Sequence, residues 1–323
     1  TETDDAILYS DGASTISSAI AAFAKRGDLL VVDSGVSEPI VTGISLSRAN
    51  IVWFKHNDMN DLRRVLENIQ ATDKKLKRRP NDQRRFLVVE GLYKNWGTIA
   101  KLKELVRLKE KFHYRLMMDE SFSFGTLGET GRGVIELEER KYMHHVEVVT
   151  ISLENALGAI GGVCVGNEEV VDHQRLSGAG YCFSAASPPF TAAAAIAALN
   201  QLRDQPQLLY RLKDNKLYLY EKLDKDLPPQ LKVLSDKRSP ITYVGLVDQT
   251  SVPNAVEFME DVARECLRHK VALVATGGYV KGHLHAKPPP ALRLCVSAMQ
   301  TYPDIDQAVH AIGAATKKVL AKY

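Results

Sequence analysis

The sequence predicts an α/β fold: a mainly parallel β-sheet covered by helices on both faces, followed by a smaller C-terminal α+β domain. Short apolar runs recur through the first two-thirds of the 323-residue chain, and helix-length segments separate them. Strands that are apolar on both faces are typical of parallel sheets with helices on each side. The order of predicted helices and strands changes near residue 206. We therefore expect a large domain over residues 1–205 and a small one over residues 206–323.

The strands expected in the large domain are short apolar runs, several of which end in a carboxylate or a glycine. They cover residues 5–10, 29–33, 51–54, 86–90, 115–119, 147–152 and 162–166. Helices are predicted over residues 14–24, 59–69, 101–112 and 189–202, and in the first of them apolar residues recur at helical spacing. The charge run over residues 74–79 is interpreted as a solvated loop; the alternative is contact with an anionic membrane surface or an acidic partner.

The small domain is expected to begin with a long helix rich in Leu, Tyr and Lys over residues 208–227, which leads into Pro228 and Pro229. Short strands are predicted over residues 231–234, 241–246, 271–274 and 292–296, and helices over residues 253–269 and 305–321. This order of helices and strands is typical of an α+β domain.

The composition is ordinary for a folded globular protein, with 45% hydrophobic and 25% charged residues. A formal net charge of +3 is too small to indicate nucleic acid as a partner. No apolar run approaches the roughly 18 residues of a membrane span. Because the chain opens at Thr1, close to a predicted strand, we expect it to be a fragment of a longer protein whose N-terminal part is missing.

The cysteines are scattered, without CxxC or other metal-ligand spacing, so no metal site is expected. Two of them, Cys164 and Cys295, lie in apolar runs, which favours buried thiols in a reducing compartment over disulfides. The full set is Cys164, Cys182, Cys266 and Cys295.

Three neighbouring segments carry the chemical information in this chain. They are Asp119-Glu-Ser-Phe-Ser-Phe-Gly125, Gly128-Glu-Thr-Gly-Arg-Gly133, and residues 149–162, Val-Thr-Ile-Ser-Leu-Glu-Asn-Ala-Leu-Gly-Ala-Ile-Gly-Gly. Together they resemble the core of the α-oxoamine synthases, pyridoxal-phosphate (PLP) enzymes that condense an amino acid with an acyl-CoA. The resemblance implies the fold-type-I PLP-transferase architecture of the class-II aminotransferase-like enzymes, in which each active site lies at a dimer interface.

The third segment lacks the residue that defines the chemistry of that family. Its members carry a lysine there, which holds PLP as a Schiff base, whereas this chain has Asn155. No lysine occurs between Lys141 and Lys213, so a shifted alignment does not supply one. A Schiff base requires an amine with an available lone pair, and the lone pair of an amide nitrogen is delocalised into its carbonyl. The chain therefore resembles an active-site fold without its nucleophile.

Two further cofactor positions have also changed, while one is retained. Asp119 matches the family aspartate that keeps the pyridine nitrogen protonated, so that the ring acts as an electron sink. The family histidine three residues later is replaced by Phe122. The histidine that stacks on the cofactor ring, located by counting from Asp33, is replaced by Ser37, which has no flat ring. These losses predict that the chain does not carry PLP covalently.

Other family features survive. The resemblance implies that Ser184, within Tyr181-Cys-Phe-Ser-Ala-Ala-Ser-Pro-Pro189, reaches the phosphate of the neighbouring subunit's cofactor. It also implies that Arg293 anchors the substrate carboxylate. An ordinary loop serine and a strand-edge surface cation remain open alternatives for these two residues.

One branch of the family fits best, the first long-chain-base subunits of serine palmitoyltransferase. The matching segments are residues 54–59, 85–93, 154–157 and 172–184. This resemblance implies a non-catalytic but required subunit, paired as a heterodimer with a catalytic second subunit whose lysine carries PLP. The implied reaction condenses L-serine with palmitoyl-CoA to 3-ketosphinganine, the first step of sphingolipid biosynthesis. It further implies small regulatory membrane subunits as possible partners and an endoplasmic reticulum membrane location, with the catalytic fold facing the cytosol.

Two alternatives belong to different functional classes. The first is a self-sufficient PLP-dependent acyltransferase, which requires a lysine such as Lys94 or Lys141 to lie beside Asp119. The second is a pseudoenzyme that serves only as a binding scaffold. The retained segment over residues 181–189 counts against the scaffold, because that role does not need features directed at a partner's active site.

Overall fold

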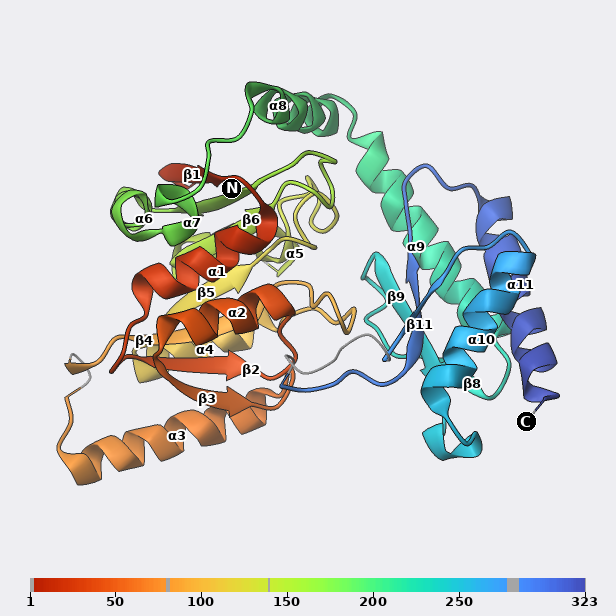
Figure 1. Cartoon of the computed structure of the whole chain (residues 1–323), viewed down its shortest axis with the longest axis horizontal. Helices are drawn as coiled ribbons and strands as arrows, with labels where there is room; N and C mark the ends of the chain where they lie inside the picture. Colours follow the sequence, from red (N-terminus) through yellow and green to blue (C-terminus); the bar gives the residue numbers. More distant parts are fainter. Residues whose placement is uncertain (1–2, 80–81, 139, 278–284, 323) are drawn as a thin grey trace. The chain divides into compact units, whose positions relative to one another are not determined.

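The computed structural model describes residues 3–79, 82–138, 140–277 and 285–322, which form two compact units (Figure 1). The first unit contains most of the chain up to Gln205, and the second contains most of the chain from Pro206 onward. Two short segments are exchanged: Asn95–Thr98 belong to the second unit, and His285 and Ala286 belong to the first. The polypeptide therefore passes between the two units more than once.

The first unit is built on a seven-stranded sheet in the order β1-β7-β6-β5-β4-β2-β3. The pairs from β6 to β3 are parallel, and β7 and β1 complete one edge as antiparallel strands. All residues of β2, β4 and β6 are buried, as expected where helices cover both faces. The strands are β1 (Asp5–Tyr9), β2 (Leu29–Asp33), β3 (Asn50–Phe54), β4 (Arg85–Glu90), β5 (Arg115–Asp119), β6 (Val148–Ser152) and β7 (Gly162–Gly166).

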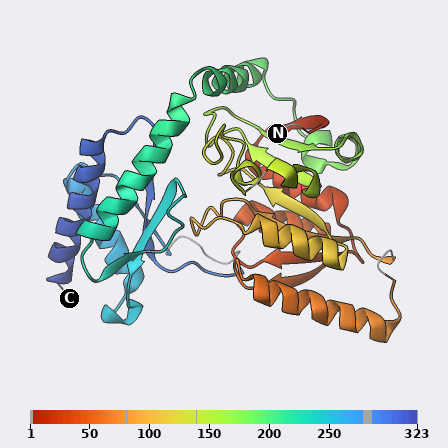
Figure 2. The same ribbon diagram turned by 180° about the vertical axis from the view of Figure 1, so that it is seen from behind.

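Helices α1 and α2 cover one face of this sheet, and α3 and α4 cover the other, as the two opposite views show (Figures 1 and 2). Helices α6 and α7 pack beside α1. This arrangement confirms the predicted mainly parallel α/β fold. The helical segments of the unit are α1 (Gly12–Phe23), α2 (Glu38–Ser47), α3 (Met59–Leu76), α4 (Leu102–Phe112), α5 (Val134–Glu138), the 3₁₀ helix η2 (Arg140–His145), α6 (Glu168–Ser177), α7 (Ala179–Cys182) and α8 (Pro189–Asp204).

Helix α2 was not predicted, because its sequence is rich in Ser and Gly and begins with Glu38 and Pro39. The helix is stabilised by packing against α1. At Gly43 a Cβ atom would lie only 2.8 Å from the Cα of Ser17, so the close approach of the two helices requires a glycine. Tertiary contact decides the structure of this segment, and local propensity does not.

Two sequence predictions are corrected by the structure. The charge run over residues 74–79 is not simply a loop, because α3 continues to Leu76 and ends at Lys77 in the left-handed conformation, with φ 51°. Buried Asp73 forms ion pairs with Arg78 and Arg85 at 3.3 and 2.6 Å, which ties this end of the helix to β4. The strand predicted over residues 271–274 begins later, as β10 (Val274–Thr276).

The second unit is a four-stranded antiparallel sheet, in the order β10-β11-β9-β8, with three helices on one face. Its core joins Val244 and Leu292 of the sheet to Phe258 and Ile312 of the helices, and all four side chains are fully buried. This is the predicted small α+β fold. The remaining elements are α9 (Gln207–Asp226), β8 (Leu231–Val233), β9 (Ile241–Leu246), the 3₁₀ helix η3 (Gln249–Ser251), α10 (Ala255–Arg268), β11 (Ala291–Cys295) and α11 (Tyr302–Leu320).

The four cysteines are free thiols, and they differ in exposure. Cys164 is buried as predicted, but the prediction for Cys295 is wrong: it is exposed at the end of β11, because side chains alternate between the two faces of a strand. Within the described ranges, no helix has the length and apolarity needed to cross a bilayer. The same ranges contain no group of three or more His, Cys, Asp and Glu side chains that could hold a metal ion.

Candidate active site at the carboxyl edge of the sheet

Four buried acidic side chains stand at the ends of neighbouring parallel strands. Asp33 ends β2, Glu90 ends β4, and Asp119 ends β5 and is followed by Glu120; their exposed fractions are 0%, 1%, 6% and 1%. The carboxyl ends of adjacent parallel strands meet at one edge of a sheet, where open α/β sheets bind their ligands. Asp119, the one of these four that the sequence predicts as a cofactor residue, therefore lies at the edge where such sites are found.

Asp119 has the position that the sequence predicts, and its carboxylate is satisfied by hydroxyl groups of the chain itself. Its Oδ1 accepts hydrogen bonds from Thr150 Oγ1 at 2.7 Å and Ser121 Oγ at 2.8 Å. Burial raises the pKa of Asp119 to about 6, although both hydroxyl bonds act in the opposite direction. The side chain is a buried acid that ionises close to neutral pH.

Asn155 lies in the turn that follows β6, and its side chain is tied to the turn that follows β5. The amide Nδ2 donates a hydrogen bond to the backbone carbonyl of Ser121 at 2.8 Å. Ser121 therefore links the two predicted residues, since its hydroxyl binds Asp119 and its carbonyl binds Asn155. The structure thus links Asp119 and Asn155 through Ser121, and Asn155 offers this edge an amide and not an amine.

Phe122 and Ser37, where the resemblance implies histidines, are also near this edge. Phe122 is partly buried in the turn directly after Ser121. Ser37 is buried at the start of α2, and its backbone N–H donates to Glu90 Oε1 at 2.5 Å. Burial, together with the charge of Asp119, raises the pKa of Glu90 to about 8. Neither Phe122 nor Ser37 supplies an imidazole to the site.

A second network at this edge, centred on Asp33, was missed by the sequence analysis. The carboxylate of Asp33 accepts hydrogen bonds from Tyr93 OH at 2.9 Å and from the backbone N–H groups of Gly35 and Asn57 at 2.7 and 2.8 Å. His56 Nδ1 lies 2.8 Å from the same carboxylate, and its ring packs edge-on against that of Tyr93 at 4.5 Å. The signal was a strand-end aspartate, which had served only as the point from which Ser37 was counted, together with the Lys-His-Asn-Asp run, which had served only as a matching segment of the family branch.

Glu120 was also missed, and it explains the glycine-rich run that follows. Its carboxylate accepts the backbone N–H groups of Val134 and Ile135, at 3.0 to 3.2 Å, at the start of α5. At Gly133, where φ is 88°, a Cβ atom would lie 2.5 Å from Glu120 Oε2. Burial raises the pKa of Glu120 to about 7. The close approach of Gly133 to the buried Glu120 carboxylate is therefore a structural reason for this glycine.

The amino end of α1 lies at the same edge, beside the Asn155 turn. At Gly12 a Cβ atom would lie 2.5 Å from Ser152 Oγ, so the first residue of the helix touches the end of β6. Ser184 is exposed near this helix end: its Oγ donates to the carbonyl of Gly180 at 2.6 Å and accepts from Ser10 Oγ at 3.5 Å. The structure therefore leaves the Ser184 side chain at the surface, next to the segment that leads into α1.

Arg293 belongs to the second unit, where it lies on β11 opposite Tyr243 of β9. Its neighbours Leu292 and Leu294 point into the core, so Arg293 points to the other face of the small sheet. The guanidinium Nε is buried and has no hydrogen-bond partner among the described residues. Arg293 takes no part in the hydrogen bonds that join Asp119 to Asn155 in the first unit.

The two lysines that an autonomous enzyme would need are engaged elsewhere. Lys94 Nζ lies 3.5 Å from Glu38 Oε2, and Lys141 Nζ lies 5.2 Å from the centre of the Tyr142 ring. Both contacts are with neighbours other than Asp119. The geometry described for these side chains gives no support to a relocated Schiff-base lysine.

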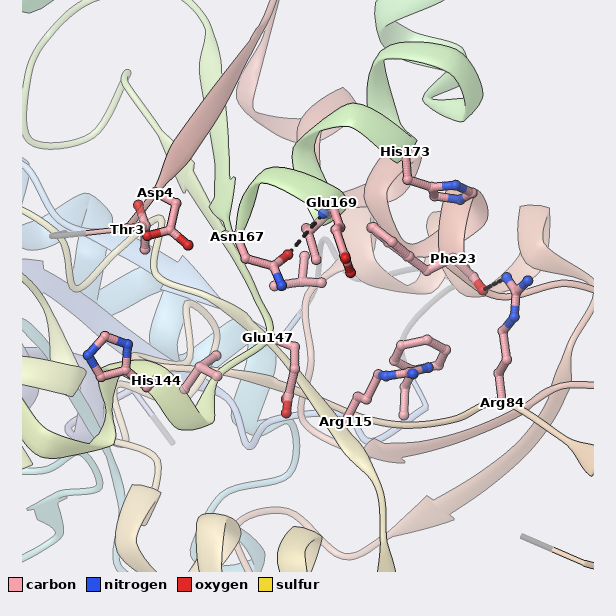
Figure 3. Close-up of a pocket in the computed structure, with 15 residues that line it drawn as sticks. Thr3, Asp4, Phe23, Arg84, Arg115, His144, Glu147, Asn167, Glu169 and His173 are labelled. Atoms are coloured by element: carbon pink, nitrogen blue, oxygen red, sulfur yellow. Dashed lines mark hydrogen bonds between the residues drawn. The ribbon is translucent and has the colours of Figure 1, made fainter. Parts of the chain in front are cut away.

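A cavity of about 720 Å³ lies at the opposite edge of the sheet, near the first residues of β4, β5 and β6 (Figure 3). Arg84, Arg115 and His173 point toward it, and Arg84 donates to the carbonyl of Phe23 at 3.2 Å across its wall. None of the predicted site residues lines this cavity. It is therefore separate from the candidate active site.

The family description "Aminotransferase class I and II" matches residues 1–312. The chain belongs to this PLP-dependent family. It is 40% identical over 321 residues to Long chain base biosynthesis protein 1c of Oryza sativa subsp. japonica, and 40% identical over 329 residues to Serine palmitoyltransferase 1 of Dictyostelium discoideum. Each match covers 99% of this chain, but the chain spans only 64% and 66% of the length of these relatives.

Solved structures confirm the fold-type-I PLP-transferase fold. The serine palmitoyltransferase of S. paucimobilis, with a bound PLP–myriocin aldimine, superimposes with a TM-score of 0.83 at 26% identity, covering 99% of this chain and 74% of that one. The serine palmitoyltransferase of Sphingomonas wittichii gives a TM-score of 0.82 at 25% identity, with the same coverage of both chains. The resemblance to this branch of the family is therefore confirmed.

The residues at this edge do not fit a covalently held PLP. Asn155 has no amine to offer, and its amide is already used to bind Ser121. Asp119 is the one residue of the set that keeps a suitable group, since its two hydroxyl partners both bind Oδ1 and leave Oδ2 able to accept an N–H. No flat side chain stands at Ser37. The family's cofactor chemistry cannot be derived from this set of side chains.

Proposed function

We propose that this chain is a non-catalytic but required subunit of serine palmitoyltransferase. The observation that carries the proposal is Asn155, held in place by Ser121 at the position where the family has its Schiff-base lysine. In the proposed heterodimer, a catalytic second subunit supplies the lysine and covalently binds PLP. The chain described here completes the site of that partner and stabilises the dimer.

The proposed reaction of the complex joins L-serine to palmitoyl-CoA, with release of CO₂ and CoA, to give 3-ketosphinganine. In this scheme Ser184 reaches toward the phosphate of the partner's cofactor, consistent with its exposed position beside α1. Arg293 binds the carboxylate of the amino-acid substrate, and its unpartnered buried Nε is available for such an anion. The proposal also includes small regulatory membrane subunits and an endoplasmic reticulum membrane location with the catalytic fold facing the cytosol.

A set of exposed apolar side chains supports the proposal that a partner subunit binds this end of the first unit. We call it the α7–α8 face. Phe183 is 89% exposed and Phe190 69% exposed, and in α8 only Thr191 and Ala195 are buried. Large exposed apolar patches mark protein interfaces, and this one adjoins Ser184. Its members are Leu176, Tyr181, Phe183, Phe190, Ile196 and Leu199.

The proposal is tested by adding PLP to the chain alone, and to the chain co-purified with a lysine-bearing partner. Borohydride trapping and serine-dependent formation of 3-ketosphinganine are followed in both samples. We expect no trapped adduct and no turnover from the chain alone, and both from the complex. If the chain alone traps PLP at Lys94 or Lys141 and turns over serine, it is a self-sufficient acyltransferase. If the partner is equally active without this chain, the chain is only a scaffold.

The α7–α8 face gives a second, independent test. Phe183→Glu introduces a charge at the centre of the proposed interface, and we expect it to weaken binding of the partner by about 100-fold, measured by titration of labelled subunits. Leu76→Glu is the matched control, because Leu76 is also exposed, at 60%, but lies at the far end of α3. Equal effects of the two changes would show that the face has no special role.

A further inference from the structure

The amino edge of the seven-stranded sheet carries a concentration of exposed positive charge. Helices α1, α2 and α3 each run back from the carboxyl edge, so their last residues, and the segments that follow them, lie at this amino edge (Figure 1). Exposed lysines and arginines occupy all three places. We call this surface the amino-edge face, and it comprises residues 24–28, 46–50, 73–79 and 82–85.

Contacts between neighbouring segments make this face one continuous surface. The carbonyl of Asp28 accepts the backbone N–H of Asn50 at 2.8 Å, and its Oδ1 accepts the backbone N–H of Arg84 at 3.1 Å. The next residue, Arg85, binds Asp73 near the end of α3 at 2.6 Å. The loop after α1, the turn between α2 and β3 and the end of α3 are therefore held side by side.

The acidic residues of the face do not balance its cations. Asp73 is buried and is neutralised by Arg78 and Arg85, at 3.3 and 2.6 Å. Two further acids, Asp28 and Asp82, remain against the exposed cations, so the face has a large excess of positive charge. The exposed cations that form no ion pair with a described residue are Lys25, Arg26, Arg48, Lys74, Lys75, Lys77 and Arg79.

Ordinary helix stabilisation accounts for part of this charge. Lys74 and Lys75 lie in the last turn of α3, and Arg48 is the residue at which α2 ends, so all three are near the negative end of a helix dipole. That effect fades within one turn and does not account for Arg26 and Arg79. A solvated basic surface is the remaining simple explanation, and it gives no reason for apolar side chains at the same place.

Two exposed leucines lie among these cations. Leu46, in the last turn of α2, is 61% exposed, and Leu76, the last residue of α3, is 60% exposed. A surface that combines lysines and arginines with exposed apolar side chains is suited to a bilayer interface, where the cations meet lipid phosphates and the apolar groups enter the acyl boundary. Because the two leucines come from different helices, the face offers two contacts with the apolar layer.

We infer that the amino-edge face docks the chain on an anionic lipid membrane. Lysine and arginine side chains bind the headgroup phosphates, and Leu46 and Leu76 insert below them. A nucleic acid fits less well, because the segments of the face include no aromatic residue on which bases could stack. An acidic protein would use the cations, but its charged groups would gain nothing from the leucines. The inference rests on the membrane location in the proposed function and deepens it, since it says which surface of the chain meets the lipid.

The first test compares two triple variants of the full chain that lose the same charge. The variant of the face carries Lys74→Gln, Lys75→Gln and Lys77→Gln. The matched control carries Lys55→Gln, Lys101→Gln and Lys103→Gln, at exposed positions beside the carboxyl edge of the same sheet.

Binding is measured by flotation with vesicles of equimolar phosphatidylcholine and phosphatidylserine, and with vesicles of phosphatidylcholine alone. We expect the parent chain to bind the anionic vesicles and to bind the neutral ones far more weakly. The variant of the face should bind the anionic vesicles about 100-fold more weakly than the parent, because each cation at a membrane surface contributes about fivefold. The control should bind them like the parent.

The second test concerns the apolar contact. Leu76→Gln should weaken vesicle binding by about tenfold, because the side chain then has no apolar surface to bury in the acyl boundary. This loss should persist at high salt, which screens the contribution of the lysines. The matched control is Leu267→Gln, since Leu267 is 62% exposed in the last turn of α10. Duplex RNA and polyglutamate are polyanions without an apolar layer, so Leu76→Gln should not change the binding of either.

Several outcomes overturn the inference. It is wrong if the parent chain binds neutral and anionic vesicles equally, if the two triple variants lose affinity to the same degree, or if Leu76→Gln and Leu267→Gln behave alike. It is also wrong if polyglutamate or duplex RNA binds the parent chain more tightly than the anionic vesicles do, in which case the face recognises an acidic protein or a nucleic acid.

Circular dichroism and thermal unfolding check that each variant keeps the fold of the parent chain. The salt dependence of vesicle binding by the parent chain tests the contribution of charge without any substitution. No partner, serine or palmitoyl-CoA is present in these measurements. The inference can therefore fail while the proposed subunit is active, and it can hold while that subunit is inactive.

Discussion

The carboxyl edge of the sheet has two halves, one at the ends of β2 and β4 and one at the ends of β5 and β6. Both contain buried acidic residues, but these residues form hydrogen bonds with different parts of the chain. In the β2–β4 half, Asp33 and Glu90 bind groups from several loops, among them His56, Tyr93 and the backbone N–H of Ser37. In the β5–β6 half, Asp119 Oδ1 accepts the hydroxyl groups of Ser121 and Thr150, and exposed Asn155 donates one described hydrogen bond to the carbonyl of Ser121. The first half joins β2 and β4 to the loop after β3 and to the start of α2, whereas these bonds of the second half join only the ends of the adjacent strands β5 and β6.

This difference predicts unequal effects on stability. Asp33 and Glu90 hold loops in place, each through several buried hydrogen bonds. Asn155 is exposed and makes one described hydrogen bond, and Phe122 is only partly buried, so a substitution at either position removes few buried contacts. The comparison predicts that variants of the first half alter stability and that variants of the second half have little effect.

The largest expected effect is that of Asp33→Asn. The carboxylate is 0% exposed and accepts four groups, and an amide would turn an NH₂ toward donors that it cannot satisfy. We expect a loss of about 3 to 5 kcal/mol in the free energy of unfolding of the first unit. Urea unfolding monitored by hydrogen exchange in β2 and β4 measures it. Asp58→Asn, at an exposed helix cap, should cost about 1 kcal/mol or less, and equal losses would contradict the special role of Asp33.

The next effect concerns pH and Glu90. Burial raises its pKa to about 8, from an ordinary value of 4.5, so the folded chain holds this proton more tightly than the unfolded chain. The resulting stability is fully present below pH 4.5 and is lost as the pH rises through 8. Glu90→Gln should therefore remove a slope of about 1.4 kcal/mol per pH unit within this window. The substitution also destabilises the folded chain at every pH, because it places an amide beside a backbone N–H, but this loss does not change the slope.

The measurement is urea unfolding at several pH values between 5 and 8, with Glu257→Gln as the control. Glu257 is an exposed first-turn residue of α10, and its replacement should leave the slope unchanged. If Glu90→Gln and the parent chain show parallel pH dependence, Glu90 is not held protonated by burial.

A smaller effect is expected for Tyr93→Phe. The substitution removes the hydroxyl that donates to Asp33 at 2.9 Å but keeps the buried ring and its contact with His56. We expect a loss of about 1 to 3 kcal/mol, because the buried carboxylate retains its other donors. A double-mutant cycle with Asp33→Asn, measured by urea unfolding, should show coupling of at least about 0.5 kcal/mol. Additive effects would mean that the two side chains act separately.

The sequence predicted the strands of this edge because their residues are apolar on both faces, as in Leu29–Asp33 and Arg85–Glu90. It could not predict that β7 and β1 are antiparallel, because the side-chain pattern of a single strand does not reveal the direction in which that strand runs in the sheet. It could not predict α2 either, whose stability comes from the close approach at Gly43. What was predictable was local, and what was missed depends on contacts between distant segments.

The same distinction holds for the candidate site. Asn155 was found by comparing one position with a family pattern, which requires no knowledge of its neighbours. Its bond to Ser121 spans 34 residues, and the bonds of Asp33 to His56 and Tyr93 span 23 and 60 residues.

The smallest effect is expected for Asp119→Asn, and it tests whether the local half has any remaining chemistry. The amide oxygen can still accept the hydroxyl groups of Ser121 and Thr150, so stability at pH 6 should change by less than about 1 kcal/mol. Because burial raises the pKa of Asp119 from 3.8 to about 6, the parent chain loses stability as the pH rises from 3.8 to 6, so the variant should gain on the parent chain within this window and not beyond it. Serine-dependent turnover of the complex should stay within about twofold, because in the proposed complex the partner subunit holds the cofactor. A loss of turnover of about 100-fold at unchanged partner affinity would instead mean that Asp119 acts in the reaction, and that the β5–β6 half still contains a working site.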